Sequence, residues 1–467
     1  MTTKAESFIL NDFNAHKFDG DSYLVTTENG SWSLLSKEEY DKFRLGKLNE
    51  GSQLKNHLQE RGLILSEENI SQEVKKHALK NQFLFTGPSL HIITPTLRCN
   101  QRCTYCHSAP SEKDSKKRDL NVETGKEIID FAMEANSDVL RFEFQGGEPL
   151  LNFDVVEEII DYAEKRAGES RKKVGFSVVS NLTTLNGEII DELKKRDVNI
   201  STSLDGPREI HDKNRKYVGG GGTYEDVAEN IKKLRGEDID VHALCTVTGD
   251  SLDRGEEIVD EYLDLGMDYI WLRPLNKIGF ADESWGEVGY TAKEFVDFYS
   301  KTLDYILQEE DIKELYAVLL AKKILGVRDP EMTEMTSPCG AGISQLLYDY
   351  RGDIYTCDEA KVFEEFKLGN VEDVDWEDVF TSETLLSMVD ISSKKNYLCN
   401  NCEWEPFCSI CPVNTYSEQG TIVSKLPEDY RCKLYSGLIE DVFKRLLFNQ
   451  DQREVLQKWA KQSEIFG

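Results

Sequence analysis

Thr96-Leu97-Arg98-Cys99-Asn100-Gln101-Arg102-Cys103-Thr104-Tyr105-Cys106 is the stretch of sequence that decides the fold. It places Cys99, Cys103 and Cys106 in a C-x3-C-x2-C spacing, directly after an apolar run at residues 90–93. A four-iron cluster has four corners, and each corner needs a ligand, usually a thiolate. Three cysteines on one loop therefore leave one iron open. An open coordination position is what separates a catalytic metal site from a closed structural one.

A zinc site is the alternative explanation of these three cysteines. Zinc loops favour C-x2-C pairs with two further ligands downstream, and this triplet, with Tyr105 before its last cysteine, fits that pattern poorly. The triplet resembles that of the radical S-adenosylmethionine (SAM) enzymes. This resemblance implies that the open iron chelates SAM and cleaves it to a 5′-deoxyadenosyl radical, which takes a hydrogen atom from the substrate.

Composition bounds the class of protein. The chain has 467 residues, enough for two or three domains, and carries 86 Asp and Glu against 56 Lys and Arg. This acidic balance argues against nucleic acid or an anionic membrane as a partner. Residues 1–6 lack the apolar core of a signal peptide, and no stretch reaches the ~20 apolar residues of a membrane span. We therefore expect a cytoplasmic protein whose eleven cysteines bind metal rather than form disulfides.

Residues 1–80 are predicted to form a small separate module. The pattern is a hairpin around Asn29-Gly30, a helix opened by the capping box Ser36-Lys37-Glu38-Glu39, a second helix and a short strand. The hairpin strands, the second helix and the last strand are expected at residues 23–27, 31–35, 52–61 and 63–65. This pattern resembles the winged-helix peptide-recognition elements that are fused to peptide maturases. A plain N-terminal decoration is the alternative.

Residues 81–290 alternate between strand and helix patterns. Strands are predicted at residues 90–94, 139–144, 175–180, 198–204, 240–247 and 269–273. Amphipathic helices are predicted between them at residues 123–134, 155–166, 187–195, 224–235 and 255–265. Six such units in series predict an α/β fold with a parallel sheet, arranged as an open, partial (β/α)6 TIM-like barrel. Residues 291–335 are predicted as a helical linker, and residues 438–459 as a closing helix.

Candidate catalytic and binding motifs follow the predicted strands at their C-terminal ends, which is where active sites lie in sheets of this kind. Gly146-Gly147-Glu148-Pro149 follows the second strand, and its glycines let backbone approach a ligand closely, although a tight turn is the alternative. By resemblance to the radical SAM motifs, Gly146, Gly147, Glu148 and Pro149 accept the amino group of SAM. Ser180 and Asn181 then bind its ribose, and Tyr105 lies near the adenine. Arg215 is a candidate partner for a carboxylate, with a surface arginine as the alternative.

The predicted C-terminal domain, residues 336–467, contains seven further cysteines: Cys339, Cys357, Cys399, Cys402, Cys408, Cys411 and Cys432. A zinc ribbon is the alternative for their C-x2-C pairs, but seven ligands leave three over from one zinc site. Two four-iron clusters need eight ligands. The pattern resembles the SPASM domain, an auxiliary-cluster extension of radical SAM peptide modifiers. The family's central run commonly ends C-x3-C, whereas Cys408 to Cys411 is C-x2-C.

This second resemblance implies which cysteines share a cluster. Cys339, Cys357 and Cys411 hold a nearer auxiliary cluster, and Cys399, Cys402, Cys408 and Cys432 hold a farther one. The nearer cluster then has three thiolates and one open iron that can bind a substrate cysteine; a non-cysteine protein ligand is the alternative. Cys245, the eleventh cysteine, lies in a predicted strand and is expected to be a buried thiol.

The whole chain resembles the His-Xaa-Ser-system type of radical SAM/SPASM maturase. The resemblance implies an enzyme that modifies a ribosomally made precursor peptide, with SAM and three [4Fe–4S] clusters as cofactors. A flavodoxin or ferredoxin supplies electrons, and the N-terminal module captures the leader by strand addition. The expected product is an intrapeptide crosslink, preferably a thioether rather than a C–C or C–O bond. The alternatives are a formylglycine-forming sulfatase maturase and a zinc-stabilised binding protein without catalysis.

Overall fold

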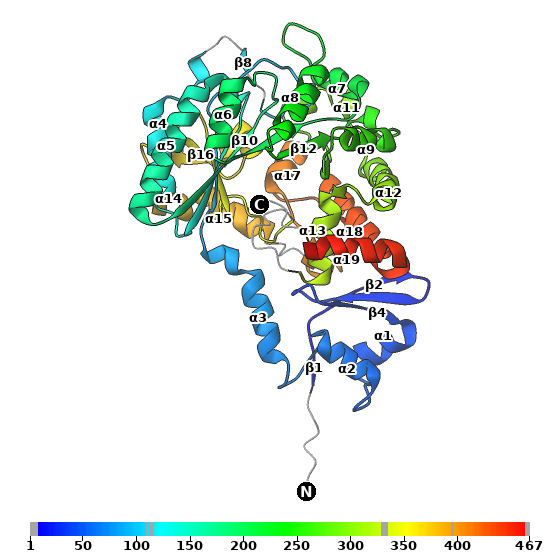
Figure 1. The fold of residues 1–467 in the computed structure, drawn as a ribbon. Helices are drawn as coiled ribbons and strands as arrows, with labels where there is room; N and C mark the ends of the chain where they lie inside the picture. Colours follow the sequence, from blue (N-terminus) through cyan, green and yellow to red (C-terminus); the bar gives the residue numbers. More distant parts are fainter. Residues whose placement is uncertain (1–7, 109–110, 113–115, 328–334, 394–396, 463–467) are drawn as a thin grey trace.

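The computed structural model describes residues 8–108, 111–112, 116–327, 335–393 and 397–462. Its centre is a ten-stranded sheet in the order β14-β13-β12-β11-β10-β9-β6-β15-β16-β17 (Figure 1). The six predicted strands are present and parallel to one another, which confirms the expected α/β sheet. They are β6 Leu90–Ile93, β9 Val139–Phe144, β10 Lys173–Val179, β11 Val198–Ser203, β12 Val241–Thr246 and β13 Tyr269–Arg273.

The predicted helices lie between these strands in the chain. They are α4 Val122–Ala132, α5 Phe153–Ser170, α6 Gly187–Lys195, α8 Tyr224–Gly236 and α9 Gly255–Asp264, and α7 Arg208–Asn214 was not predicted. Asparagine caps begin two of them: the Asn121 side chain accepts a bond from the Thr124 nitrogen, and Asn186 caps α6 in the same way. Each helix turns its apolar face to the sheet, and the parallel strands are therefore buried.

The sheet continues into the C-terminal third of the chain. Strand β15 Gln345–Tyr348 pairs in parallel with β6, and β16 Asp353–Tyr355 and β17 Lys367–Asn370 follow it as antiparallel neighbours. At the other edge, β14 Lys313–Glu314 pairs with β13. Backbone pairing to the barrel thus helps to organise this third of the chain. Cys339 and Cys357 flank β15 and β16, so this pairing brings them to the strand that precedes the cysteine triplet.

Helices complete the C-terminal third. α12 Ala292–Glu309 and α13 Leu315–Leu325 fill the described part of the predicted linker, of which residues 328–334 lie outside the description. The single closing helix is a wrong prediction, because α18 Tyr430–Phe448 and α19 Gln450–Gln462 are separate. Asn449 between them has extended backbone angles, φ −122° and ψ 109°. Shorter helices are α10 Phe280–Glu283, α11 Trp285–Val288, α14 Trp376–Thr381, α15 Glu383–Ser392, α16 Tyr397–Asn400 and α17 Pro412–Gln419.

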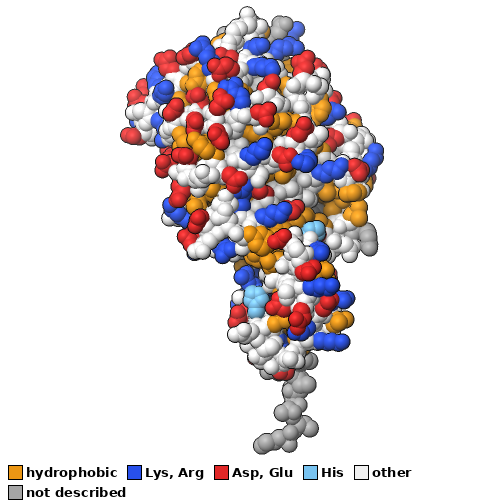
Figure 2. Space-filling view, turned by 90° about the vertical axis from the view of Figure 1, so that its right-hand side faces the viewer, with side chains coloured by type: hydrophobic (Ala, Val, Ile, Leu, Met, Phe, Trp, Pro, Cys, Tyr) orange, Lys and Arg blue, Asp and Glu red, His pale blue; other side chains and the backbone are white. Residues whose placement is uncertain are grey.

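The N-terminal residues form a lobe of their own at the lower end of the molecule (Figures 1 and 2). The predicted hairpin is present as β3 Ser22–Thr26 and β4 Trp32–Ser36, and a third strand, β2 Asn14–Asp19, joins it. The lobe also contains α1 Lys37–Arg44, α2 Gln53–Glu60, the pair β1 Ile9–Leu10 and β5 Ile64–Leu65, and α3 Ile70–Lys80. Strand β2 and helix α3 were not predicted, since the polar run from Asn14 to Lys17 lacks an alternating pattern.

The three-stranded sheet is fixed to the C-terminal third rather than to the barrel. The Asn14 amide donates to the Cys402 carbonyl at 3.0 Å, and the Thr26 hydroxyl donates to the Glu403 carbonyl at 2.9 Å. The Trp32 indole donates to the Ile324 carbonyl at 2.6 Å. The N-terminal lobe therefore contacts the cysteine run that begins at Cys399. No helix within the described ranges is both long and apolar enough to cross a membrane.

Candidate functional site

The cysteine loop leaves β6 and is fixed by backbone hydrogen bonds on both sides. It begins in the short strand β7 Arg98–Cys99, which pairs with β8 Ser111–Glu112. The Arg102 nitrogen donates to the Lys216 carbonyl at 2.8 Å, and the Thr104 nitrogen donates to the Asn214 carbonyl at 2.9 Å. Because these bonds use main-chain atoms, they hold the path of the loop whatever its side chains do.

The three thiols of this loop lie close enough to influence one another. Burial raises the pKa of Cys99, and the nearby Glu148, Cys103 and Cys106 raise it further. Burial likewise raises the pKa of Cys103 to about 12, with Cys106 adding to the effect. Arg215 opposes this rise at Cys103. Three thiols on one loop are the ligand set that an iron–sulfur cluster with one open corner needs. The loop therefore fits a multi-iron cluster.

The grouping of the later cysteines stays a prediction, and the electrostatic effects among them agree with part of it. Burial raises the pKa of Cys357, and Cys411 and Cys339 raise it as well. Burial raises the pKa of Cys402 to about 12, and Cys399 and Cys432 contribute. Cys408, the fourth predicted member of the farther group, points its thiol at the Ser409 carbonyl, 3.5 Å away. Cys245 is fully buried on β12, as predicted.

None of the eleven cysteines, all of which lie in the described ranges, forms a disulfide. Among the residues that the structure describes, no three thiol, imidazole or carboxylate groups converge closely enough to bind a single metal ion.

The two glycines after β9 are required by the cysteine loop. A side chain at Gly147 would place its Cβ 2.1 Å from the carbonyl oxygen of Arg98, and one at Gly146 would lie 2.7 Å from that of Thr96. The Gly147 nitrogen donates to the Thr96 carbonyl at 2.9 Å, and the Glu148 nitrogen donates to the Arg98 carbonyl at 2.7 Å. The sequence predicted close approach to a ligand, and the structure shows close approach to the loop that carries Cys99.

Glu148 joins the motif to the end of β10. Its fully buried carboxylate accepts bonds from the Ser180 hydroxyl at 2.8 Å and from the Asn181 nitrogen at 2.7 Å. Burial raises the pKa of Glu148 to about 7. The Asn181 amide reaches the side chain of Asn100 at 2.9 Å and the sulfur of Cys99 at 3.8 Å. These predicted SAM contacts thus form one network beside the first cysteine, and their roles toward SAM stay predictions.

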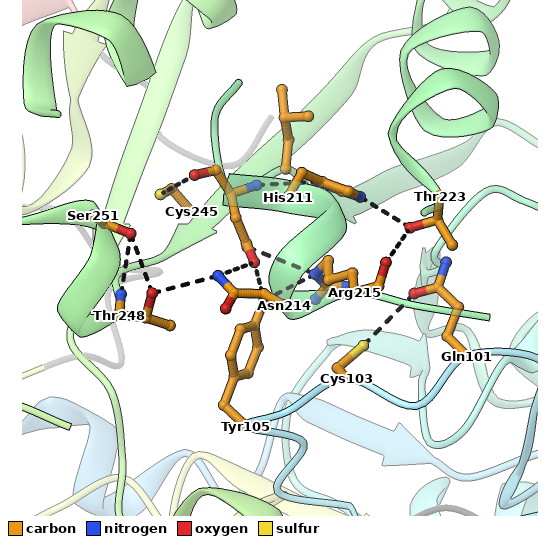
Figure 3. A network of polar contacts seen from close by, with 12 residues as sticks. Gln101, Cys103, Tyr105, His211, Asn214, Arg215, Thr223, Cys245, Thr248 and Ser251 are labelled. Atoms are coloured by element: carbon orange, nitrogen blue, oxygen red, sulfur yellow. Dashed lines mark hydrogen bonds and ion pairs between the residues drawn. The ribbon is translucent and has the colours of Figure 1, made fainter. Parts of the chain in front are cut away.

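A second network lies on the other side of the loop (Figure 3). The Tyr105 hydroxyl donates to Asp205 at 2.5 Å and accepts from the Arg215 Nε at 2.9 Å. The Asn214 amide reaches both Asp205 and Thr248, at 3.3 and 3.4 Å. Asp205 is fully buried; burial raises its pKa and Arg215 opposes that rise. The Arg215 side chain contacts Tyr105 and Asp205 through its Nε, and its carbonyl accepts from the Thr223 hydroxyl at 3.0 Å (Figure 3).

Sequence reasoning missed the roles of Asp205 and Asn214. The available signal was an acidic residue at the end of a predicted apolar strand, followed by Gly206. Burying such a carboxylate is costly unless a partner compensates for it, and Arg215 with Tyr105 is that partner here. The network fixes Tyr105 in the middle of the cysteine loop.

A group of charged side chains lies between the first and the nearer cysteine groups. The His107 ring is 3.7 Å from the Asp358 carboxylate. Burial lowers the pKa of Lys361, and the charges of both Cys106 and Cys357 act on this lysine. Burial raises the pKa of Glu143 to about 7 and lowers that of His107 to about 4. Sequence reasoning missed all four residues, although Asp358 directly follows Cys357.

Glu359, the next residue, lies against the nearer group. The Asn414 amide donates to its carboxylate at 2.7 Å and to the Cys411 sulfur at 3.1 Å. The same Glu359 oxygen is 3.7 Å from that sulfur, and the Asn276 amide donates to the other oxygen. A carboxylate and three thiols therefore share one place in the fold.

An open α/β barrel with a cysteine triplet after its first strand, followed by two further cysteine groups, defines a radical SAM enzyme with auxiliary clusters. The comparisons agree with this class. Residues 93–270 match the radical SAM superfamily, and residues 339–403 match the SPASM iron–sulfur cluster-binding domain. The chain belongs to the radical SAM superfamily and carries a SPASM domain. It is a peptide-modifying enzyme of this class, and its cofactors are SAM and [4Fe–4S] clusters.

Relatives of this chain differ in how much of it they cover. A cysteine-type anaerobic sulfatase-maturating enzyme of Clostridium perfringens is 25% identical over 77% of this chain and 97% of its own length. The radical SAM cyclopropyl synthase TigE of Paramaledivibacter caminithermalis is 23% identical over 88% of this chain and 87% of its own. The crystal structure of Streptococcus suis SuiB bound to precursor peptide SuiA has a TM-score of 0.55 and 18% identity. It covers 91% of this chain and 99% of its own length, which shows a shared fold.

Proposed function

We propose that this chain modifies a ribosomally made precursor peptide by forming an intrapeptide crosslink, with a thioether preferred over a C–C or C–O bond. The proposal assigns residues 1–80 to leader recognition, 81–290 to the radical SAM barrel, 291–335 to a linker and 336–467 to the auxiliary clusters. The observation that carries it is the 3.7 Å contact between His107 and Asp358, because these residues directly follow Cys106 and Cys357 and so link the first cysteine group to the nearer one.

The roles of the site residues follow from their positions. Cys99, Cys103 and Cys106 hold the SAM-binding cluster, which with SAM supplies a 5′-deoxyadenosyl radical that removes a substrate hydrogen. Tyr105, the Gly146–Pro149 motif, Ser180, Asn181 and Arg215 line the SAM side, where Arg215 offers outer nitrogens to the SAM carboxylate. His107, Glu143, Asp358 and Lys361 face the substrate side and can bind, orient or deprotonate its polar groups.

The two auxiliary groups have unequal numbers of cysteines. Cys399, Cys402, Cys408 and Cys432 complete four corners of the farther cluster. Cys339, Cys357 and Cys411 provide three ligands for the nearer one, so one corner has no cysteine. This corner favours thioether formation, because an iron can hold a substrate thiolate and lower its pKa.

We propose that the N-terminal lobe, a winged-helix-like element, binds the leader. A groove of about 270 Å³ lies between helix α3 and the β3–β4 turn. Its apolar lining is Leu65, Ile70 and Val74, and its polar lining is Asn11, Asp12, Glu28, Asn29, Glu73 and His77. Val74 is 61% exposed and Ile70 41% exposed, one turn apart on α3. An extended peptide can place apolar side chains here while its backbone pairs with a strand edge. An apolar leader segment is therefore the occupant that this groove favours.

A sulfatase maturase that makes formylglycine is the second candidate. It is favoured by the identity to the Clostridium perfringens enzyme, which extends over 97% of that protein. That match covers 77% of this chain, whereas SuiB, with its precursor peptide, covers 91%. The extra coverage favours a substrate that carries a leader. We also propose a cytoplasmic location, with a flavodoxin or ferredoxin as the low-potential donor.

The test uses the short open reading frames beside the gene. Anaerobically reconstituted enzyme is incubated with SAM, dithionite and each encoded peptide, and the products are sequenced by mass spectrometry. A crosslink removes two hydrogens and joins two residues; replacing the core cysteine by serine then abolishes a thioether. A peptide carrying the sulfatase cysteine motif is the comparison substrate. Conversion of that peptide to formylglycine, with no crosslink in any neighbouring peptide, would establish the second candidate instead.

A further inference from the structure

We propose that Glu359 supplies the eighth auxiliary ligand and occupies the corner of the nearer cluster that lacks a cysteine. The inference rests on the proposed assignment of Cys339, Cys357 and Cys411 to that cluster. Three cysteines leave one iron of this cluster without a cysteine ligand, and Glu359 is the protein ligand that we assign to that iron.

Glu359 is in contact with a cysteine of the nearer group. A Glu359 oxygen is 3.7 Å from the Cys411 sulfur, and the Asn414 amide bonds both groups. Glu359 is also two residues after Cys357, so the same short segment brings a thiol and a carboxylate to the nearer group. This contact joins a carboxylate to a cysteine assigned to the nearer cluster.

Two amide side chains fix the orientation of the Glu359 carboxylate. Ligating carboxylates in proteins are usually held by further hydrogen bonds. Asn276 and Asn414 donate to opposite oxygens of Glu359, and Asn414 is only 2% exposed. The two amides come from different parts of the fold, the loop after β13 and helix α17. They fix the carboxylate beside the cysteines in advance of any metal.

A substrate thiol can bind to the nearer cluster by replacing Glu359. Iron–sulfur clusters prefer the softer thiolate, so a substrate cysteine can replace the carboxylate. In that exchange one iron–oxygen bond breaks and one iron–sulfur bond forms. The proton of the incoming thiol passes to the freed Glu359 carboxylate, and no electron is transferred. Glu359 is therefore a ligand in the resting enzyme and a proton acceptor during substrate binding.

The test uses the full-length chain with Cys99, Cys103 and Cys106 changed to Ala, so that only the auxiliary clusters remain. Reduced protein is titrated with 13C-cyanide, and pulsed electron paramagnetic resonance detects carbon coupled to a cluster. We expect Glu359→Ala to show the coupling at about tenfold lower cyanide than the parent, equal to one order of magnitude in affinity. Glu359→Cys should resist cyanide and keep about eight irons.

Glu365→Ala is the matched control, because Glu365 lies six residues further on and bonds to Tyr416 instead. It should titrate like the parent protein. Equal cyanide response in the parent, Glu359→Ala and Glu365→Ala would overturn the inference. So would a parent cluster that already binds cyanide as readily as Glu359→Ala. Glu359→Cys is the control for misfolding, because it places a thiolate ligand at the same position and should keep the cluster.

A separate variant distinguishes this inference from the assignment beneath it. Cys339→Ala with Cys411→Ala should lose about four irons if these residues hold the nearer cluster. No loss of iron would refute the cluster assignment itself. A loss of iron in that variant, combined with Glu359→Ala behaving like Glu365→Ala, would refute the role of Glu359 alone.

Discussion

The backbone nitrogen of Glu148 donates a hydrogen bond to the carbonyl oxygen of Arg98 at 2.7 Å, which ties the Gly-Gly-Glu-Pro motif to the residue before Cys99. The motif follows the second barrel strand and the cysteine loop follows the first, and the two strands are parallel neighbours. Their loops therefore emerge side by side at the same edge of the sheet. Anything that disturbs one of these loops should disturb the other.

Gly147→Ala should damage the cysteine loop, because its Cβ would lie 2.1 Å from the Arg98 carbonyl oxygen. Overpacking of this kind typically costs about 1–3 kcal/mol, and here it falls on backbone that cannot rotate away. We expect the variant to lose SAM affinity and about four irons after reconstitution. The control is Gly168→Ala on α5, where nothing lies within 4 Å of the added atom. Wild-type iron content and SAM binding in Gly147→Ala would contradict the argument.

Replacing Cys99, Cys103 and Cys106 together by Ala should abolish 5′-deoxyadenosine formation. These residues are the predicted ligands of the SAM-binding cluster, and the auxiliary groups use other cysteines. Iron content should therefore fall to about eight, not to zero. Cys245→Ala removes a thiol that bonds to the Asp205 carbonyl outside all three groups, and should keep its iron. Deoxyadenosine release by the triple variant at the wild-type rate would refute the assignment.

Val74→Glu should weaken leader binding without affecting SAM cleavage in the absence of peptide. The substitution puts a charge into the groove of the N-terminal lobe, and a desolvated carboxylate opposes docking of an apolar leader segment. We expect affinity for the full precursor peptide to fall about tenfold or more, measured by calorimetry. Val423→Glu, at a residue 56% exposed and in the C-terminal third, is the control. Equal affinity in both variants would show that the leader binds elsewhere.

Glu314 should make stability depend on pH. Its carboxylate is fully buried, accepts from the Tyr299 hydroxyl at 2.5 Å and caps helix α13. Burial raises its pKa from an ordinary 4.5 to about 7. A carboxyl whose pKa rises on folding stabilises the fold at low pH and loses that advantage as the pH passes through 7. Wild type should therefore lose up to about 3 kcal/mol relative to Glu314→Gln between about pH 5 and pH 8.

Apparent melting temperatures of the two proteins across this pH range test the prediction. As the pH rises, the melting temperature of wild type should fall relative to that of Glu314→Gln. Because Glu314 lies at the edge of the sheet and not among the cysteines, iron content should stay equal in the two proteins. A difference that is constant with pH would mean that Glu314 keeps its charge throughout.

Much of the architecture was predictable because it depends on local patterns. Strand β13 and helix α6 match their predicted bounds at both ends, since apolar periodicity and an asparagine cap act within a few residues. Strand β2 was missed because its residues do not alternate between apolar and polar. Helix α3 was missed although Ile70, Val74 and Ala78 recur at helical spacing. The break at Asn449 was also missed, since the apolar residues continue on both sides of it.

The sequence by itself determined the chemical class of this protein, because a C-x3-C-x2-C loop after a strand is a local arrangement that needs no fold to be recognised. Only the tertiary structure decided which distant residues share a site. The Asp205 carboxylate meets Tyr105 across 100 positions, and Asn414 meets Glu359 across 55. The first contact forms because parallel strands bring separate loops to one edge of the sheet, and the second because helix α17 returns to the segment after β16. No local propensity encodes which side chains then face one another.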